Sequence, residues 1–369
     1  MTDKLAWLAL RGIPRVGPVL FHRLLAAFGS PARVLSATLK ELTSVRGVSL
    51  GLAQAIHDFR EWDRLEAQLH RLEAQGCRTL TLEDADYPLR LREIPIPPPI
   101  LFVKGEIIPK DSLAVALVGT RRASYYGLRT CRRLARELAQ QGVTVISGLA
   151  RGIDTMAHQG ALEGGGRTLA VLGCGLDVVY PPENRELYRE IPESGALISE
   201  YPLGTPPEPQ NFPRRNRLIS GLALGVVVVE AAEQSGAHIT VQCALEQGRE
   251  VLAVPGPIDS PTSRGPHRLI QEGAKLVREV GDILTELPKN APAPKDSGPK
   301  TLQVNTQGTQ LSLLLDDPLL PFLGTEPVQL EELMQVSRLP APEVLSRLTL
   351  LELQGLIREL PGKCYILEA

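Results

Sequence analysis

Arginine gathers in two short turns of the chain. Arg121 and Arg122 follow the apolar run 113–118, and Arg214 and Arg215 stand at the start of a later predicted helix. The planar guanidinium group presents paired N–H donors that match phosphate oxygens, and the free N–H groups at a helix start add positive potential. This pattern predicts a site for a phosphate-bearing anion.

Aromatic side chains accompany these arginines. Aromatic residues make up only 4% of the chain, yet four of them fall near the ends of predicted strands: Tyr125, Tyr126, Tyr201 and Phe212. Cationic groups for the backbone and rings for stacked bases are the two components of a groove for single-stranded nucleic acid. The alternative is that the tyrosines only fill the edges of the core.

The turn over 119–127 differs from the turn that binds dinucleotides. It is longer than the Gly-x-Gly-x-x-Gly pattern and has arginine where a second glycine would let the backbone approach a pyrophosphate. Ser124 either contacts a phosphate or caps the following helix. A second turn of the same kind contains Ser147 and Gly148, and its glycines permit a backbone nest for an anion.

Catalytic groups are sparse. Asp154 and His158 are four residues apart on a predicted helix, which allows a catalytic dyad, although a helix cap with a surface pair is favoured. Glu230 ends a predicted strand and either pairs with an arginine, accepts a sugar hydroxyl or acts in catalysis. The sequence contains no Ser–His–Asp set, phosphate-binding P-loop or metal-binding cluster, so we expect neither a cofactor nor a metal.

The overall composition is that of an ordinary globular protein. Of 369 residues, 43% are apolar and 22% are charged, and the net charge is −2, so a basic site must be local. The five cysteines are scattered without metal-site spacing. No apolar run reaches the roughly 20 residues of a membrane helix, and the first residues lack a signal-peptide layout. We therefore expect a cytoplasmic protein.

The central part, 113–287, alternates short apolar runs with helical patterns. The predicted strands are 113–118, 143–146, 168–172, 196–199, 226–230, 250–254 and 275–277. The predicted helices are 126–141, 153–163, 183–190, 216–222, 239–247 and 267–272. This alternation predicts an α/β fold with a doubly wound, mainly parallel sheet that is covered on both faces. Ligands of such sheets bind where strands end and helices begin.

The N-terminal part, 1–75, is predicted to be helical. Residues 12–18 and 45–49 each precede an apolar helix and resemble helix-hairpin-helix turns, whose amides can hold a DNA phosphate. Residues 1–57 contain seven lysine and arginine side chains and two acidic ones. The alternative is a small packing domain. Residues 76–112 have a proline cluster and are predicted to be an extended connector packed on the next domain.

The C-terminal part begins with residues 288–320, a flexible linker by composition. Residues 321–369 then follow the winged-helix order of helix 328–334, helix 341–354 and a hairpin. Because residues 328–369 have four basic and six acidic side chains, we expect a protein-contact or packing role there rather than duplex binding.

Five motifs in this order resemble those of the DprA family, also called Smf, the DNA-processing protein A of bacterial natural transformation. The motifs are Gly119-Thr120-Arg121 with Ser124 and Gly127, Ser147 to Asp154, Phe212 to Arg217 with Ile219-Ser220-Gly221, Val229-Glu230-Ala231 through Ser235-Gly236, and Arg249 through Val254-Pro255-Gly256. The resemblance covers nearly the whole chain, including the helical and winged-helix ends.

The resemblance implies a non-enzymatic recombination mediator with an extended Rossmann-like domain. Members bind single-stranded DNA in a basic pocket, form homodimers through that domain and load RecA, also onto strand coated by single-strand-binding protein. The predicted DNA-binding residues are Gly119, Arg121, Arg122, Ser124, Ser147, Gly148, Phe212, Arg214, Arg215 and Asn216.

Two other classes of function stay open at this stage. A Rossmann-like enzyme of the nucleotide phosphoribohydrolase type would use Glu230 and an arginine on a nucleoside monophosphate. Its Pro-Gly-Gly-x-Gly-Thr pattern is absent from this chain. A protein-interaction adaptor is the third class.

Overall fold

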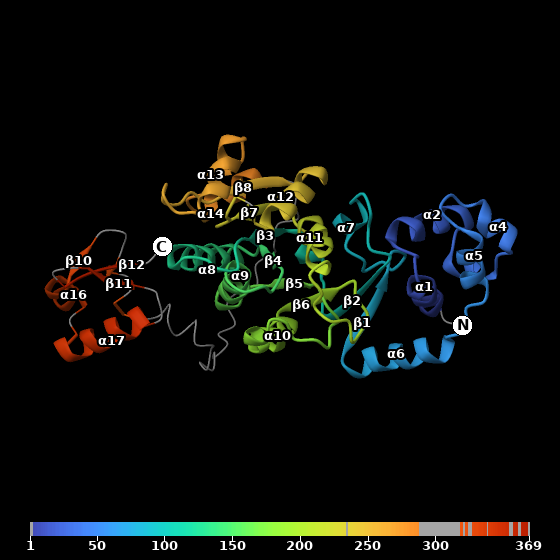
Figure 1. Ribbon diagram of the computed structural model, residues 1–369, viewed down its shortest axis with the longest axis horizontal. Helices are drawn as coiled ribbons and strands as arrows, with labels where there is room; N and C mark the ends of the chain where they lie inside the picture. Colours follow the sequence, from blue (N-terminus) through green and yellow to red (C-terminus); the bar gives the residue numbers. More distant parts are fainter. Residues whose placement is uncertain are drawn as a thin grey trace.

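The computed structural model describes residues 3–233 and 235–287, and parts of the C-terminal region at 318–319, 322–323, 327–337, 339–353, 357–360 and 363–367. It forms a helical N-terminal unit, a central three-layer α/β unit and a small C-terminal unit (Figure 1). The linker predicted over 288–320 lies outside the described residues except for 318–319.

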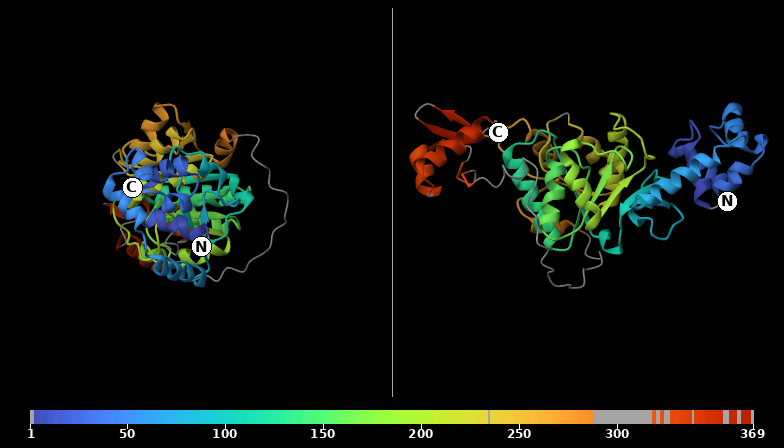
Figure 2. Two further views of the ribbon diagram at one scale, coloured as in Figure 1. Left: turned by 90° about the vertical axis from the view of Figure 1, so that its right-hand side faces the viewer. Right: turned by 90° about the horizontal axis from the view of Figure 1, so that it is seen from below.

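The N-terminal unit is helical, as predicted. Its helices are α1 (Asp3–Gly12), α2 (Pro18–Phe28), α3 (Pro31–Ser36), α4 (Leu39–Ser44), α5 (Leu50–His57) and α6 (Trp62–Ala74). Trp7 of α1 stacks on Phe21 of α2 with ring centroids 5.4 Å apart, and both side chains are buried. The unit lies at one end of the molecule, beyond the first strand of the sheet (Figure 2).

The central sheet has nine described strands in the order β1-β2-β6-β5-β4-β3-β7-β8-β9. Their bounds are β1 (Cys77–Thr81), β2 (Ile100–Gly105), β3 (Ala114–Val118), β4 (Thr144–Ser147), β5 (Thr168–Leu172), β6 (Gly195–Ser199), β7 (Gly225–Val228), β8 (Glu250–Ala253) and β9 (Lys275–Leu276). The strands from β3 to β9 pair in parallel, which confirms the predicted fold class.

The segment predicted to be a connector contributes two of these strands. β2 pairs antiparallel with β6, and β1 pairs antiparallel with β2, so residues 76–112 extend the sheet at one edge. The proline cluster between them obscured this pairing because proline is rare inside strands. Tyr87 closes the segment by donating its hydroxyl to the carbonyl of Pro98 at 2.8 Å.

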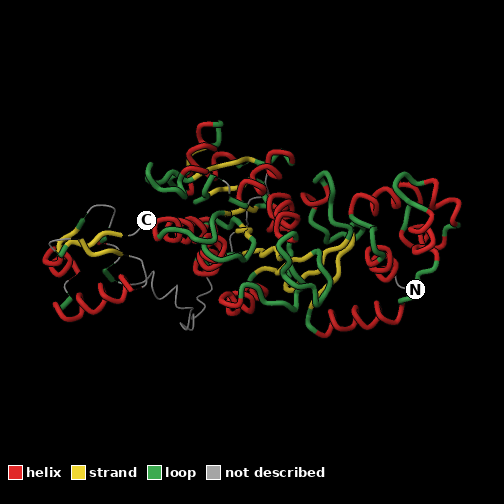
Figure 3. Tube along the Cα trace, in the orientation of Figure 1, coloured by secondary structure: helices red, strands yellow, loops and turns green. Residues whose placement is uncertain are grey.

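Alternate residues of each strand feed two cores. Val115 and Leu117 of β3 pack with α8 (Tyr125–Gln140) and α9 (Ile153–Glu163), whereas Ala116 of β3 packs on the opposite side, with α11 and α12. The remaining helices of the central unit are α7 (Leu89–Arg92), η1 (Pro109–Ser112), η2 (Pro182–Asn184), α10 (Arg185–Glu190), η3 (Ile191–Glu193), α11 (Asn211–Leu222), α12 (Ala237–Glu246), α13 (Arg264–Gln271) and α14 (Val280–Glu286). Helices therefore cover both faces (Figure 3).

The strand order creates a crevice at one place. From β3 the chain proceeds outward through β4, β5 and β6, and then returns to β7 on the other side of β3. The loops that leave β3 and β7 therefore diverge, and ligands of doubly wound sheets bind at such a switch point. The arginine turn after β3 lies there.

Three helices begin at least two residues earlier than predicted: α11 at residue 211 instead of 216, α12 at 237 instead of 239, and α13 at 264 instead of 267. Pro213 does not interrupt α11, because the N–H groups in the first turn of a helix have no acceptor within the helix, so the missing N–H group costs no hydrogen bond. Arg214 and Arg215 consequently lie on the helix, where consecutive residues point in different directions.

The C-terminal unit has the predicted winged-helix order. It contains β10 (Val328–Gln329), α16 (Leu330–Ser337), α17 (Ala341–Leu353), β11 (Ile357–Leu360) and β12 (Cys364–Leu367). Its first helix begins at Leu330, since Val328 and Gln329 pair with β12 instead. None of the described helices is both long and apolar enough to span a bilayer.

Candidate nucleic-acid interface

A buried carboxylate fixes the turn that carries Arg121 and Arg122. Glu230, which is 2% exposed, accepts a hydrogen bond from the backbone N–H of Ser124 at 2.9 Å and another from its hydroxyl at 2.6 Å. The Ser124 hydroxyl also accepts from the N–H of Gly127 at 3.1 Å, so it caps α8. The favoured prediction, a pairing of Glu230 with an arginine, was wrong. Glu230 pairs with Ser124 instead.

Two glycines make this close approach possible. A Cβ atom at Gly127 would lie 2.3 Å from a carboxylate oxygen of Glu230, and one at Gly119 would lie 2.6 Å from the side chain of Ile153. Gly119 thus serves packing as well as the turn. The N–H of Thr120 donates to the carbonyl of Glu230 at 2.7 Å, which ties the same turn to the end of β7.

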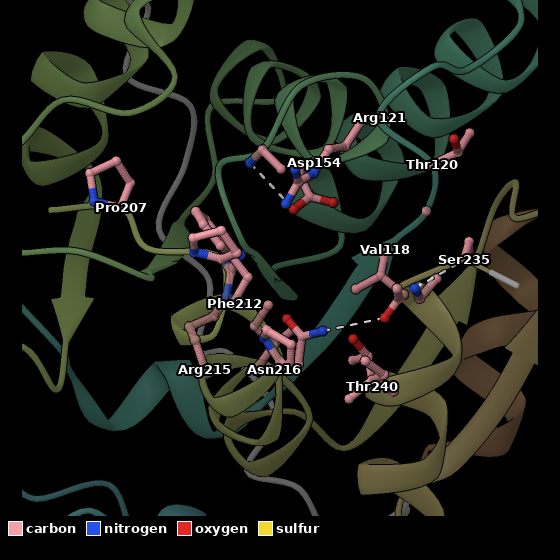
Figure 4. Close-up of a pocket in the computed structure, with 18 of the residues that line it drawn as sticks. Val118, Thr120, Arg121, Asp154, Pro207, Phe212, Arg215, Asn216, Ser235 and Thr240 are labelled. Carbon is pink, nitrogen blue, oxygen red and sulfur yellow. Dashed lines mark hydrogen bonds between the residues drawn. The ribbon is translucent and has the colours of Figure 1, made fainter.

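An open cleft of about 530 Å³ lies between this turn, the start of α11 and the start of α12. Arg121 lines it from the turn after β3, Phe212 and Asn216 from α11, and Ser235 from the loop before α12 (Figure 4). The cleft stands at the carboxyl ends of β3 and β7, where the topology predicts a ligand.

Phe212 lies between two guanidinium groups. The Cζ atom of Arg121 is 5.1 Å from the centroid of the Phe212 ring, and the Cζ atom of Arg215 is 5.8 Å from it. Tyr180 packs against the same ring at a tilt of 47°. These contacts hold the ring in place at low conformational cost for a ligand that stacks on it.

Arg215 is buried beneath this ring, with 3% exposure. Its guanidinium group donates to the carbonyl of Val171 and occupies the space beside Gly148, where a Cβ atom would lie 1.9 Å from Nη1. Burial lowers the pKa of Arg215, and the nearby carboxylate of Asp154 opposes this shift. Burial likewise raises the pKa of Asp154, and Arg215 opposes that shift. Each of the two charges therefore stabilises the ionised form of the other beneath the cleft.

The other predicted DNA-binding residues divide into two groups. Arg122 is exposed and lines the cleft, and so does Asn216, which donates to the carbonyl of Gly236 at 3.4 Å. Arg214 is exposed on α11 but does not line the cleft. Ser147 is fully buried and donates to the carbonyl of Leu117 at 2.7 Å. Ser124, Ser147 and Gly148 therefore shape the site from beneath, and do not line the cleft.

The tyrosines singled out in the sequence have structural contacts. Tyr125 is buried, the hydroxyl of Tyr126 donates to the carbonyl of Pro255 at 2.7 Å, and that of Tyr201 donates to the carbonyl of Asn211 at 3.3 Å. The structure supports the alternative that the tyrosines fill core edges for Tyr125, whereas Tyr126 is 41% exposed. Of the four aromatic residues, only Phe212 lines the cleft.

Asp154 and His158 do not form a dyad. Asp154 accepts from the N–H groups of Gly148 and Ala150, and His158 contacts the hydroxyl of Thr168 at 2.7 Å. Because that hydroxyl donates to a backbone carbonyl, Nδ1 of His158 is the donor in this contact. The favoured surface pair was also wrong, since both residues are buried.

Several lining residues were not predicted. Tyr180 and Asp154 come from loops and helices that reach the cleft only in three dimensions, as do the prolines and small residues Pro207, Pro209, Ser235, Gly236 and Thr240. The sequence signal for Ser235 and Gly236 was the motif that begins at Val229 and ends with these two residues. Among the described residues, no group of three histidine, cysteine or acidic side chains could hold a metal ion.

Comparisons with known proteins identify the family. The sequence model of the family DNA recombination-mediator protein A matches residues 78–288. The family model of the DprA winged-helix domain matches 313–363, and that of a SAM-like helix-hairpin-helix tandem matches 8–60. The chain belongs to the DNA recombination-mediator protein A (DprA) family.

Similar proteins cover most of this DprA chain. Protein Smf of Synechocystis is 34% identical and aligns with 99% of this chain and 98% of its own length, and Protein Smf of Escherichia coli is 42% identical over 86% and 84%. The X-ray structure of DprA from Streptococcus pneumoniae has a TM-score of 0.69, 34% identity, and coverage of 78% of this chain and 98% of that chain. The structure of DprA from Helicobacter pylori, described for its mode of binding single-stranded DNA, has a TM-score of 0.51, 30% identity and coverage of 56% and 94%.

The Glu230 contact makes a prediction about stability. Glu230→Gln replaces a carboxylate that accepts two hydrogen bonds with an amide that accepts at one oxygen only. We expect a loss of about 2 kcal/mol in the free energy of unfolding, measured by urea denaturation. The matched control is Glu233→Gln, at an exposed position on the following loop. Equal stability of both variants would contradict this role of Glu230.

His158 predicts a pH dependence. Burial lowers the pKa of His158 to about 3, with the charge of Arg215 as the second cause. The unfolded chain, with a histidine pKa near 6.5, therefore binds a proton that the folded protein does not. The free energy of unfolding should fall as the pH drops from 6.5, by about 1.4 kcal/mol per unit from this one residue.

Acid denaturation of His158→Gln tests this prediction. Between pH 6 and pH 4, the free energy of unfolding of this variant should decline less steeply than that of the unaltered protein. The control His70→Gln, at an exposed position, should behave like the unaltered protein. Parallel curves for all three proteins would show that His158 takes up its proton in the folded state.

Proposed function

We propose that this DprA family member binds single-stranded DNA in the cleft at the carboxyl edge of the sheet, with little sequence preference. The observation that carries the proposal is the pairing of the exposed guanidinium group of Arg121 with a fixed aromatic ring, that of Phe212. Arg121, Arg122 and Arg214 are exposed, and among the described residues none of their side chains has an ion-pair partner.

Phosphate groups fit the exposed arginines. The turn over 119–124 is held rigidly by Glu230, so the side chain of Arg121 leaves a fixed backbone. Contacts of this kind position a nucleic-acid backbone without reading its sequence. By contrast, Arg217 is not available, because it donates to the carbonyl of Ile96 and pairs with Glu200.

A base fits the ring of Phe212. The ring is half-buried and lines the cleft, and Tyr180 packs against it. The exposed guanidinium group of Arg121 lies over the ring in the absence of DNA and would leave that face to a base when it turns to a phosphate. Stacking on an aromatic side chain tolerates every base because each base has a π-face. The structure of the Helicobacter pylori relative, described for binding single-stranded DNA, supports the same class of ligand.

Charge reversal of Arg121 tests the proposal. Arg121→Glu should lower the affinity for oligothymidine by about 10-fold or more in fluorescence anisotropy, because a phosphate contact becomes a repulsion. It should also make the salt dependence shallower. The control is Arg64→Glu. The exposed side chain of Arg64, on α6, pairs with Glu61 just before that helix. Unchanged affinity of a folded Arg121→Glu protein would refute the site.

Arg214→Glu is a second usable variant, whereas Arg215→Glu is not. Arg214 is exposed, so its reversal leaves the packing intact. Arg215 is buried beside Asp154, and a second carboxylate there would test folding instead of binding.

We propose further that the protein delivers bound strand to RecA, also when single-strand-binding protein coats the DNA. Membership of a recombination-mediator family supports this role. Arg121→Glu should then fail to start RecA filaments on coated strand, as followed by the DNA-dependent ATPase of RecA. Normal stimulation of the RecA ATPase by this variant would show that RecA loading does not require DNA binding through Arg121, and would contradict this part of the proposal.

We propose that the Rossmann-like domain forms the homodimer. Ile258, in the loop after β8, is 85% exposed, and Leu276 on the edge strand β9 is also exposed. An apolar side chain beside an unpaired strand edge favours association. Ile258→Glu should convert the protein to a monomer in sedimentation equilibrium, and Leu89→Glu, at another exposed leucine, should not. A dimer that survives Ile258→Glu would contradict this surface.

The proposal assigns the cleft no reaction. The carboxylate that a phosphoribohydrolase would need is Glu230, which is buried and already accepts two hydrogen bonds from Ser124. Release of free base from nucleoside monophosphates by the purified protein would contradict a purely binding role.

A further inference from the structure

The N-terminal unit contains two equivalent hairpins. Val16 before α2 and Val48 before α5 are both buried, and each donates its N–H to the carbonyl three residues earlier. Gly17 and Ser49 cap the two helices with nearly the same backbone angles. Arg15 and Gly47 precede the valines, and both have positive φ, 74° and 99°. The pair therefore forms a tandem, in agreement with the family model that matches 8–60.

The surface around the hairpins is strongly basic. Among residues 4–57, which the structure describes, the exposed charged side chains are Arg15, Arg23, Arg33, Lys40, Glu41 and Arg46. The one carboxylate of this set is engaged, because Glu41 accepts from the N–H and the hydroxyl of Thr38. The net charge of the whole chain is −2, so this concentration of positive charge is local.

The first hairpin is connected to α11 through the segment between β1 and β2. His22 of α2 contacts the carbonyl of Pro97 at 2.7 Å, and Arg217 of α11 donates to the neighbouring carbonyl of Ile96 at 2.6 Å. The segment between β1 and β2 thus links the first hairpin to the helix that carries Phe212 and Arg214.

We propose that the tandem hairpins bind the sugar-phosphate backbone of the strand where it leaves the cleft. This inference rests on the proposed function, since the cleft supplies the first part of the path. The strand would pass from Arg121 and Arg214 to Arg15 and Arg46 at the two hairpin tips. Phosphates are the fitting ligand because the tips present the exposed guanidinium groups of Arg15 and Arg46, and the start of a helix offers main-chain N–H groups to an anion.

Arg15 allows a variant that removes charge without damaging the fold. A positive φ strains any residue with a side chain, and glycine adopts it freely, as at Gly47. Arg15→Gly should therefore fold with little change in thermal stability. Combined with Arg46→Ser, also at an exposed tip, it removes both tip charges.

Oligonucleotide length separates this surface from the cleft. An oligothymidine of about 6 nucleotides should occupy the cleft alone, and one of about 30 nucleotides should reach the hairpins. The double variant Arg15→Gly/Arg46→Ser should bind the short oligonucleotide like the unaltered protein and the long one about 10-fold more weakly. Its salt dependence on the long oligonucleotide should be shallower by about 1.4 in logarithmic slope, for two lost phosphate contacts.

The outcomes are distinguishable. Arg64→Ser, at an exposed arginine of α6, should change neither affinity and serves as the control for loss of a positive charge outside the hairpin tips. Equal weakening of both lengths by the double variant, or unchanged binding of the long oligonucleotide, would overturn the hairpin proposal. If Arg121→Glu leaves short-oligonucleotide binding intact, the cleft proposal fails instead, whatever the hairpin variant does.

Discussion

The contact between Glu230 and Ser124 is the interaction on which the site depends. It joins the end of β7 to the start of α8 across the switch point of the sheet, through two hydrogen bonds to one buried carboxylate. Gly127 provides the space for it, since any side chain there would overlap the carboxylate. The turn between β3 and α8 is thereby fixed, and Arg121 extends from a rigid backbone into an open cleft.

The arginines of the site have two different physical roles. Arg121 is exposed and keeps its hydration until a ligand replaces it, so it is suited to bind phosphate. Arg215 has already lost its hydration, and its charge is maintained by Asp154 and by a backbone carbonyl. Removing a buried charge of this kind disturbs the fold. Phe212 lies between the two and separates the binding surface from its support.

Local periodicity predicted most of the fold, because each parallel strand is a short apolar run and each helix has its own apolar face. The strand 168–172 was predicted with the bounds that the structure gives. β1 and β2 were missed, since their pairing depends on partners distant in the sequence. In the site, the sequence predicted the arginine turns, but it could not show that consecutive residues Arg214 and Arg215 divide into an exposed and a buried group. The contribution of Tyr180 also depends on tertiary packing.

The most direct test is a crystal structure of the protein with a short oligothymidine. The account predicts phosphate oxygens within hydrogen-bond distance of the guanidinium group of Arg121 and a thymine ring stacked on Phe212. An empty cleft, with the strand ordered on another surface of the molecule, would contradict it.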